Sequence, residues 1–193
     1  MARRILIIDG HPDPAAGRFV HAIAAAYEEA ALSAGHEVRR LTLATLDFPG
    51  LRSNEDFLQG TPPAAIGAAQ QSVTWASHLV ILYPLWLGSM PALLKSFLEQ
   101  LLRPGFAFAP ARGRGLPRKL LKGRSARIIV TMGMPALFYR WYFRAHSLKS
   151  LERNILAFCG IAPVRATLIG MVEGEPHRAA ALRKVQKLAR LGR

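Results

Sequence analysis

The chain has 193 residues, of which 51% are hydrophobic and 20% charged, a composition close to the globular average. This length fits one domain over residues 1–193, with a single sizeable core. No apolar run approaches the roughly 20 residues that cross a bilayer. The amino terminus runs directly into a strand-like segment, which leaves no room for a signal peptide. The single Cys159 excludes an intramolecular disulfide and a cysteine-based metal cluster. We therefore expect a soluble cytoplasmic protein without a metal site or stable membrane insertion.

The formal net charge of +14 is the most unusual property of the chain. It is compatible with attraction to nucleic acid, with attraction to a phosphorylated small molecule such as a dinucleotide, or with a solvated basic surface. The basic residues gather in three stretches, 112–127, 140–153 and 178–193. No nucleic-acid recognition motif accompanies them, and the aromatic residues follow strands rather than basic stripes. We therefore expect no nucleic-acid partner.

Strand-like and helical segments alternate five times along the chain. Apolar runs of strand length predict strands at 4–9, 36–43, 78–83, 125–131 and 165–169. Helical patterns occupy 19–34, 64–77, 91–102, 148–158 and 178–193, with Gly35 expected as a carboxyl-terminal cap. This alternation predicts an α/β domain with helices on both faces of a doubly wound parallel sheet. We expect strand order 2-1-3-4-5, with a ligand crevice at the carboxyl ends of the first and third strands.

Two connections are longer than usual for such a domain. Residues 45–63 form a polar, proline-rich connection, and residues 104–123 form an excursion between a helix and the fourth strand. Long loops of this kind are often lids or partner contacts.

The loop after the first strand, residues 10–18, leads directly into a helix. A helix amino terminus offers unpaired N–H groups and a positive dipole end, which suit a diphosphate. His11 and Arg18 would add donors to the same anion. The loop contains neither a Gly-x-Gly-x-x-Gly fingerprint nor a P-loop. Its pattern alone therefore leaves phosphate binding and an ordinary exposed loop equally open.

The loops after the third and fourth strands combine aromatic, apolar and small residues. Residues 83–91 read Tyr-Pro-Leu-Trp-Leu-Gly-Ser-Met-Pro, which a planar aromatic ligand lying against the backbone explains. Ordinary packing under a loop is the alternative. Residues 131–135 read Thr-Met-Gly-Met-Pro, where Gly133 allows the backbone to approach the same ring. A second aromatic cluster follows at 139–146. The Gly-Ser-Met sequence at 88–90 lacks the Gly-x-Ser-x-Gly elbow of a serine hydrolase.

Three segments together resemble one known family: Gly-His-Pro-Asp-Pro at 10–14, Tyr-Pro-Leu-Trp-Leu-Gly-Ser-Met-Pro-Ala-Leu-Leu-Lys at 83–95 and Thr-Met-Gly-Met-Pro at 131–135. They are similar to the NAD(P)H quinone reductase family, which has the flavodoxin-like fold. The resemblance covers essentially the whole chain and extends to Phe-Ala-Phe at 106–108 and Phe-Cys-Gly at 158–160. It implies hydride transfer from NAD(P)H through a bound flavin to a quinone-like acceptor.

The same resemblance implies bound FAD, or FMN as in some members, and a homodimer. Because the family includes ancillary subunits of potassium efflux systems, a flavin-binding regulatory subunit of a membrane transport system is an alternative. The acceptor itself is open between a quinone, an azo compound and a nitroaromatic. Apolar walls, expected from Trp86, Phe106, Phe108 and Trp141, favour a flat hydrophobic one.

The resemblance also assigns residues, position by position. Those expected to bind the flavin phosphates are His11, Arg18 and Phe19, and those expected along the ring are Pro84, Leu85, Trp86, Leu87, Thr131, Gly133 and Met134. Tyr139 and His146 resemble the family's catalytic pair beside the reactive face of the ring, where they stabilise charge. Their spacing is one residue longer here, and Met-Gly-Met-Pro stands where animal members have a Gly-Gly run. Arginines within 112–118 are expected to contact the phosphates of the pyridine nucleotide.

Overall fold

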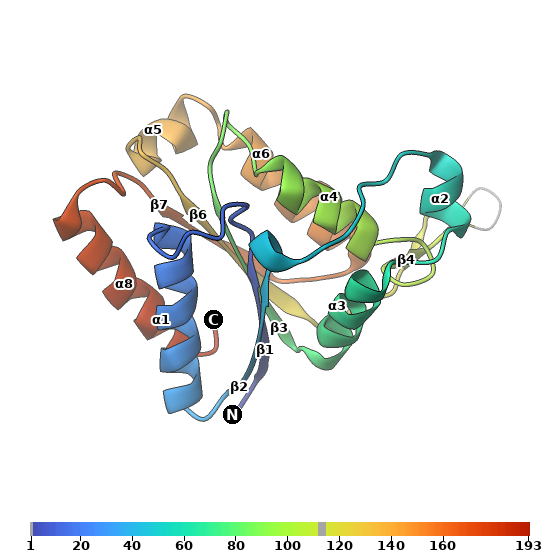
Figure 1. The fold of residues 1–193 in the computed structure, drawn as a ribbon, viewed down its shortest axis with the longest axis horizontal. Coiled ribbons are helices and arrows are strands. Elements are labelled where there is room, and N and C mark those ends of the chain that lie inside the picture. The colour runs from blue at the N-terminus through green and yellow to red at the C-terminus, as the bar shows by residue number, and fades with distance from the viewer. Residues whose placement is uncertain (1, 112–114) are drawn as a thin grey trace.

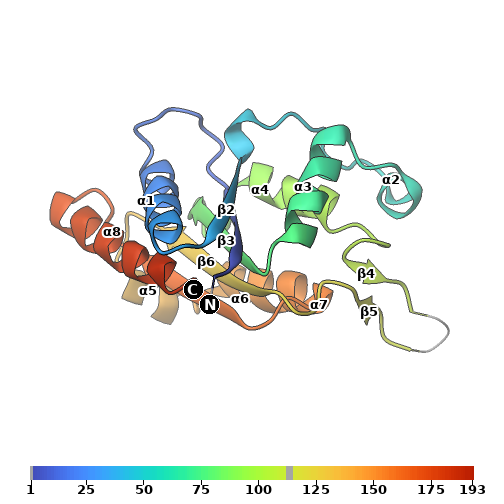
Figure 2. The same ribbon diagram turned by 90° about the horizontal axis from the view of Figure 1, so that it is seen from below.

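A computed structural model describes residues 2–111 and 115–193 of the chain (Figures 1 and 2). Arg112 and Arg114, two of the arginines expected near the nucleotide phosphates, lie outside the described residues. The main sheet has five parallel strands in the order β2-β1-β3-β6-β7. Their bounds are β1 Arg4–Asp9, β2 Glu37–Thr42, β3 His78–Pro84, β6 Ser125–Thr131 and β7 Val164–Ile169.

This order confirms the predicted 2-1-3-4-5 topology, because β4 and β5 do not belong to the main sheet. Strands β4 (Phe108–Ala109) and β5 (Arg118–Lys119) form a small antiparallel pair inside the 104–123 excursion. Every residue of the central strand β3 is buried, as expected for a parallel strand covered on both faces.

Helices cover both faces of the sheet (Figure 1). On one face lie α1 (Phe19–Ser33) and α8 (Glu175–Arg190). On the other lie α3 (Ala64–Trp75), α4 (Ala92–Leu101) and a helical stretch made of α6 (His146–Lys149), the π-helical η2 (Ser150–Leu156) and α7 (Ala157–Cys159).

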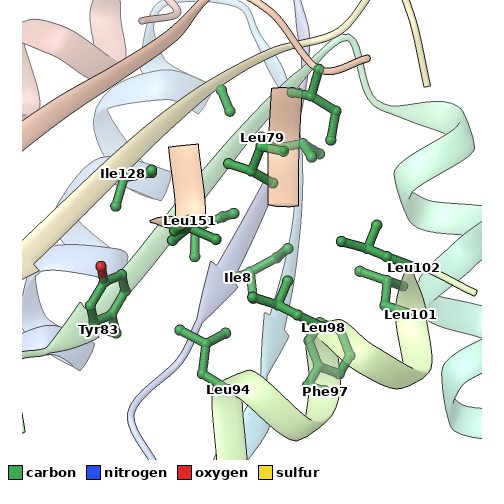
Figure 3. Packing of buried hydrophobic residues seen from close by; sticks show 14 of the residues in the cluster. Ile8, Leu79, Tyr83, Leu94, Phe97, Leu98, Leu101, Leu102, Ile128 and Leu151 are labelled. Carbon is green, nitrogen blue, oxygen red and sulfur yellow. The ribbon is translucent and has the colours of Figure 1, made fainter. Parts of the chain in front are cut away.

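Successive side chains of β1 point to opposite faces of the sheet, so they divide between these two helical layers. Ile5 and Ile7 pack in the cluster under α1 and α8, whereas Leu6 and Ile8 pack in the cluster on the opposite face. Figure 3 shows part of this second cluster, with Ile8 close to the α4 side chains. Because both faces of the sheet are sealed by helices, binding sites are left to the strand ends.

The helix ends follow local rules. Helix α1 ends where Gly35 takes φ of +80°, and the N–H groups of Gly35 and His36 donate to the carbonyls of Leu32 and Ala31. This pair of hydrogen bonds confirms the predicted glycine cap. Besides β4 and β5, the structure adds three short helical elements that the sequence patterns did not predict: the 3-10 turn η1 (Leu43–Thr45), α2 (Asn54–Gln59) and α5 (Ala136–Trp141). Among the described residues, none of the helices combines the length and the apolar character that crossing a membrane requires.

Candidate binding site at the carboxyl edge of the sheet

The last residue of β1, Asp9, holds together three elements at the carboxyl edge. Its side chain is fully buried, and Oδ2 lies 2.7 Å both from Nη2 of Arg40 on β2 and from Nδ1 of His21 on α1. Oδ1 accepts a hydrogen bond from the main-chain N–H of His11 at 3.4 Å. The other ring nitrogen of His21 lies 2.9 Å from the carbonyl oxygen of Asp13. Asp9 therefore fixes the start of the loop after β1, residues 10–18 and here called the first loop, relative to α1 and β2.

The first loop ends in a helix terminus whose backbone donors are free. Asp13 accepts hydrogen bonds from the N–H of Ala15 at 2.8 Å and from Nε of Arg18 at 2.7 Å. These two donors hold the pKa of the Asp13 carboxyl below its ordinary value. Helix α1 has no side-chain cap. Within the described residues, four N–H groups at this terminus lack a partner, those of Ala16, Gly17, Phe19 and Val20.

Such a terminus is a general binding site for an anionic group, because the free N–H groups and the helix dipole both favour negative charge. Phe19 contributes its backbone at the predicted position. The guanidinium of Arg18 is half-exposed and paired with Asp13, so it must turn away from that carboxylate to reach an anion bound at the terminus.

His11 and Trp86 bring the first and third loops into contact. The rings meet edge to face, with centroids 5.7 Å apart and an interplanar angle of 83°. His11 is only 7% exposed, and its Nδ1 accepts a hydrogen bond from the N–H of Asp13. Burial, followed by the nearby His21, lowers the pKa of His11. The ring is therefore neutral near pH 7, with its proton on Nε2 as a donor.

The loop after β3, here called the third loop, contains a tight two-residue turn. Trp86 and Ser89 exchange two backbone hydrogen bonds of 2.9 Å, and the two residues between them, Leu87 and Gly88, have φ of +46° and +76°. Positive φ at both central residues is the pattern of a type I′ turn. The side chain of Leu87 is fully exposed at its tip. The turn thus presents apolar side chains outward from a rigid backbone.

The loop after β6, the fourth strand of the main sheet in chain order, lies directly beside the third loop and is here called the fourth loop. Buried Pro84 pairs in register with Thr131, whose carbonyl accepts the N–H of Leu85 at 2.8 Å. Gly133 is exposed, and the one atom near a side chain added there is a carboxylate oxygen of Glu173, at 3.5 Å. The backbone at Gly133 is therefore open to close approach, while the neighbouring Met134 is half-buried and packs against the core.

A cavity of about 510 Å³ opens beside these loops. It is lined by the turn residues Trp86 and Leu87, by Met90 shortly before α4, and by Ser147 and Ser150 of the opposite helical stretch. A second cavity, of about 380 Å³, lies between the first loop and the end of β2. Both volumes fall in the range of small-molecule sites. Within residues 2–111 and 115–193, no group of three metal-ligating side chains accompanies them.

Tyr139 and His146 lie in different surroundings. Tyr139 is 1% exposed, and its hydroxyl lies 2.8 Å from Oγ of Ser147. His146 is exposed at the first turn of α6, and its ring makes no hydrogen bond to the residues described. Ser147 therefore stands between Tyr139 and the larger cavity. Direct catalytic roles for the Tyr139 and His146 side chains stay predictions.

Sequence reasoning did not single out Asp9, His21, Arg40 or Ser147. Only Asp9 carries a local signal, because it is a charged residue that ends an apolar run and is then followed by a glycine. The other three enter the site through tertiary contacts.

The sheet is doubly wound with order 2-1-3-4-5, and the loops of the candidate site follow its first, third and fourth strands in chain order. This arrangement defines a flavodoxin-like α/β protein. A family model described as flavodoxin-like fold matches residues 3–190, and the chain belongs to this family.

Comparison with individual proteins gives more specific likenesses. The chain is 29% identical to an uncharacterized NAD(P)H oxidoreductase of Haemophilus influenzae, over 86% of this chain and 82% of the relative. It is also 29% identical to an FMN-dependent NADH:quinone oxidoreductase of Gluconacetobacter diazotrophicus, over 76% and 72% of the two chains. The solved structure of an NAD(P)H:quinone oxidoreductase from Methanothermobacter marburgensis superposes with a TM-score of 0.82 at 21% identity, covering 98% of each chain.

Proposed function

We propose that this protein is a flavin-dependent oxidoreductase that passes reducing equivalents from NAD(P)H to a quinone-like acceptor. One observation carries the proposal: an uncapped helix terminus and an aromatic turn meet through His11 and Trp86, beside a cavity of ligand size. The names of the Haemophilus and Gluconacetobacter relatives support the same activity.

The described residues fit a flavin nucleotide, which joins an anionic phosphate to a flat ring. The free N–H groups of α1 would hold the phosphate. The backbone of Leu85 and Gly133 would border the ring, and Trp86 and Met90 would exclude water from it. A bound flavin supplies the hydride chemistry, and the protein supplies binding, orientation and electrostatics. The neutral His11 offers a hydrogen-bond donor without adding a charge beside the site.

We propose FMN as the flavin. The family resemblance implies FAD first, but the Gluconacetobacter relative is named as FMN-dependent. The four free N–H groups at the start of α1 would bind the terminal phosphate of FMN. Heat release of the ligand followed by mass measurement distinguishes FMN from FAD directly.

The activity is tested by reducing the flavin-loaded protein with NADH or NADPH without oxygen and then adding benzoquinone. We expect the yellow colour to bleach and then to return as the quinone is reduced over many turnovers. A protein that can be loaded with neither FMN nor FAD would contradict the proposal. Loading without quinone turnover would leave only a flavin-binding module and would refute the enzymatic part.

We expect Gly10→Ala to weaken flavin retention and to lower the free energy of unfolding by about 1–3 kcal/mol. A β carbon at Gly10 would lie 2.8 Å from the carbonyl oxygen of Leu82 and 3.0 Å from the Leu94 side chain. That oxygen accepts the Gly10 N–H at 2.7 Å, so the substitution separates the ends of β1 and β3. Urea unfolding and flavin content of the purified variant measure both effects.

Gly67→Ala is the matched control, since a β carbon at that position in α3 meets nothing within 4 Å. We expect unchanged flavin content and a gain of about 0.5–1 kcal/mol. Equal behaviour of the two variants would show that the junction at Gly10 does not position the site.

We also propose that two copies of the chain associate through the aromatic surface around α5. Five large side chains there are at least 40% exposed: Leu137, Phe138, Trp141, Tyr142 and Phe143. Contiguous exposed apolar surface on this scale is typical of a protein interface. The patch follows the fourth loop in the chain, so a second copy seated on it would lie beside the candidate site.

Trp141→Glu is expected to raise the dimer dissociation constant at least about tenfold, because Trp141 is 83% exposed and aromatic anchors dominate interface energies. Sedimentation velocity over a concentration series measures the constant. Leu32→Glu, an equally drastic change at an exposed leucine on α1, should leave it unaltered. A wild-type chain that stays monomeric at all concentrations would refute the interface.

A further inference from the structure

A cluster of arginines lies at the amino edge of the sheet, opposite the candidate site. Arg3 precedes β1, Arg127 is in β6, Arg165 is in β7 and Arg193 follows α8. Helix α8 returns its end to this edge, so that the start of β1 and the end of the chain lie close together in both ribbon views (Figures 1 and 2). Packing supports the same placement, because a β carbon on Gly192 would lie 2.9 Å from the Arg3 side chain.

These four arginines surround a cavity of about 180 Å³. Its buried walls include His78, the first residue of β3, and Arg127, which are 3% and 6% exposed. Arg127 and Arg165 are partners in the parallel register of β6 and β7, so their side chains leave the same face of the sheet. The cavity therefore collects donors from three neighbouring strands.

Two buried donor or acceptor atoms in these walls have no hydrogen-bond partner. Nδ1 of His78 lies 2.8 Å from Oγ of Ser125, but its Nε2 is unpaired. Nη1 of Arg127 donates to Oγ1 of Thr167 at 2.8 Å, but its Nε is unpaired. Buried polar groups without partners are rare and costly in native proteins. Both atoms belong to residues that line the cavity.

The positive charges around the cavity also lack acidic partners. Among the described residues, none of the four arginines forms an ion pair with an acidic group. His36 is engaged elsewhere, with Nδ1 accepting the Arg3 N–H and Nε2 close to the carbonyl of Arg190. The Tyr27 hydroxyl donates to a carboxylate oxygen of Arg193, the last residue of the sequence, so one negative charge lies near the four guanidinium groups. Clustering like charges around a buried guanidinium costs free energy unless an anion completes the site.

We propose that this cavity binds a phosphoryl anion, either inorganic phosphate or the phosphate group of a small phosphomonoester. Guanidinium groups match phosphate oxygens in bidentate fashion, and an anion here would accept hydrogen bonds from Arg127, Arg165 and Nε2 of His78 at once. The volume lies below the range of about 300–1,000 Å³ for sites that enclose drug-sized molecules, so only a compact group is enclosed. The site is separate from the proposed flavin site, because it occupies the other end of the strands.

The test is isothermal titration of the flavin-loaded full chain with phosphate, at constant ionic strength in chloride. Loading with flavin keeps the α1 terminus occupied. We expect saturable binding of one phosphate, weakened about tenfold in Arg165→Gln, since that change removes one charged bidentate donor. Arg183→Gln removes the same charge from the exposed face of α8 and should alter the dissociation constant less than about twofold.

Glycerol phosphate as a second titrant distinguishes the two sources of the phosphoryl group. Tighter binding than phosphate indicates a phosphomonoester, and equal or weaker binding indicates free phosphate. No saturable binding of either probe, or equal weakening in both variants, would overturn the proposal. Arg165 is exposed on an edge strand, so Arg165→Gln is expected to fold, and its flavin content reports separately on the carboxyl-edge site.

Discussion

Replacing Asp9 by Asn is expected to lower the free energy of unfolding by about 3 kcal/mol. The substitution keeps the shape of the side chain but removes the buried negative charge that faces Arg40 and His21. Arg40 is 22% exposed and also lies 3.6 Å from Glu28, so partial solvation keeps the loss at the lower end of the range for broken buried ion pairs. Equilibrium urea unfolding monitored by circular dichroism measures the change.

The same substitution should loosen the proposed flavin site, because the amide keeps one acceptor oxygen where the carboxylate serves the His11 N–H, His21 and Arg40 with two. Asp47→Asn removes an equal charge from an exposed position and should change stability by less than about 0.5 kcal/mol. If the two variants unfold alike, the buried cluster at Asp9 does not hold the loop.

Acid should destabilise the protein through His78. Burial, and then the positive charges of Arg3 and Arg127, lower the pKa of His78 from 6.5 to about 4. The unfolded chain therefore takes up a proton at this position before the folded chain does. Stability is intact above pH 6.5 and falls as the pH drops toward 4, by about 3 kcal/mol in total from this residue.

The contribution of His78 is isolated by comparing urea unfolding at pH 6.5 and pH 4 in the wild type and in His78→Gln. The pH-dependent loss should be smaller in the variant by about 3 kcal/mol. His177→Gln, at an exposed position of α8, should retain the full loss. Buried His11 also has a lowered pKa and acts in the same direction, so a residual loss is expected in every variant. An unchanged pH dependence in His78→Gln would refute this assignment.

The regular part of the fold could be predicted from sequence because its signals are local. The apolar runs at 4–9 and 125–131 match β1 and β6 to the residue, and Gly35 marks the end of α1. The six-residue helices α2 and α5 were missed because they are too short to show a helical period. The helix expected at 148–158 begins at 146 and contains a π-helical segment, which the 3.6-residue pattern does not reveal.

The candidate site and the arginine cavity could be predicted from sequence only in part. Strand order and the carboxyl-edge rule placed the loops of the candidate site correctly, whereas the contacts that fix those loops join residues 12 and 31 positions apart, as Asp9 does with His21 and Arg40. The amino-edge arginines lie between positions 3 and 193, and Arg3 and Arg165 are outside the three basic stretches of the sequence. The sequence therefore gave no sign that these arginines converge. Folding, rather than local pattern, creates both arrangements.

The 86–89 turn has a consequence for the range of acceptors that the proposed enzyme can use. Its two backbone hydrogen bonds close it without help from its side chains, and Leu87 at the tip contacts nothing that the fold requires. Positions on a self-closed loop accept new residues while the scaffold stays fixed. The rim of the larger cavity can therefore be altered, in nature or in the laboratory, at Leu87, while Trp86 keeps its contact with His11. Selectivity among flat molecules becomes tunable independently of folding.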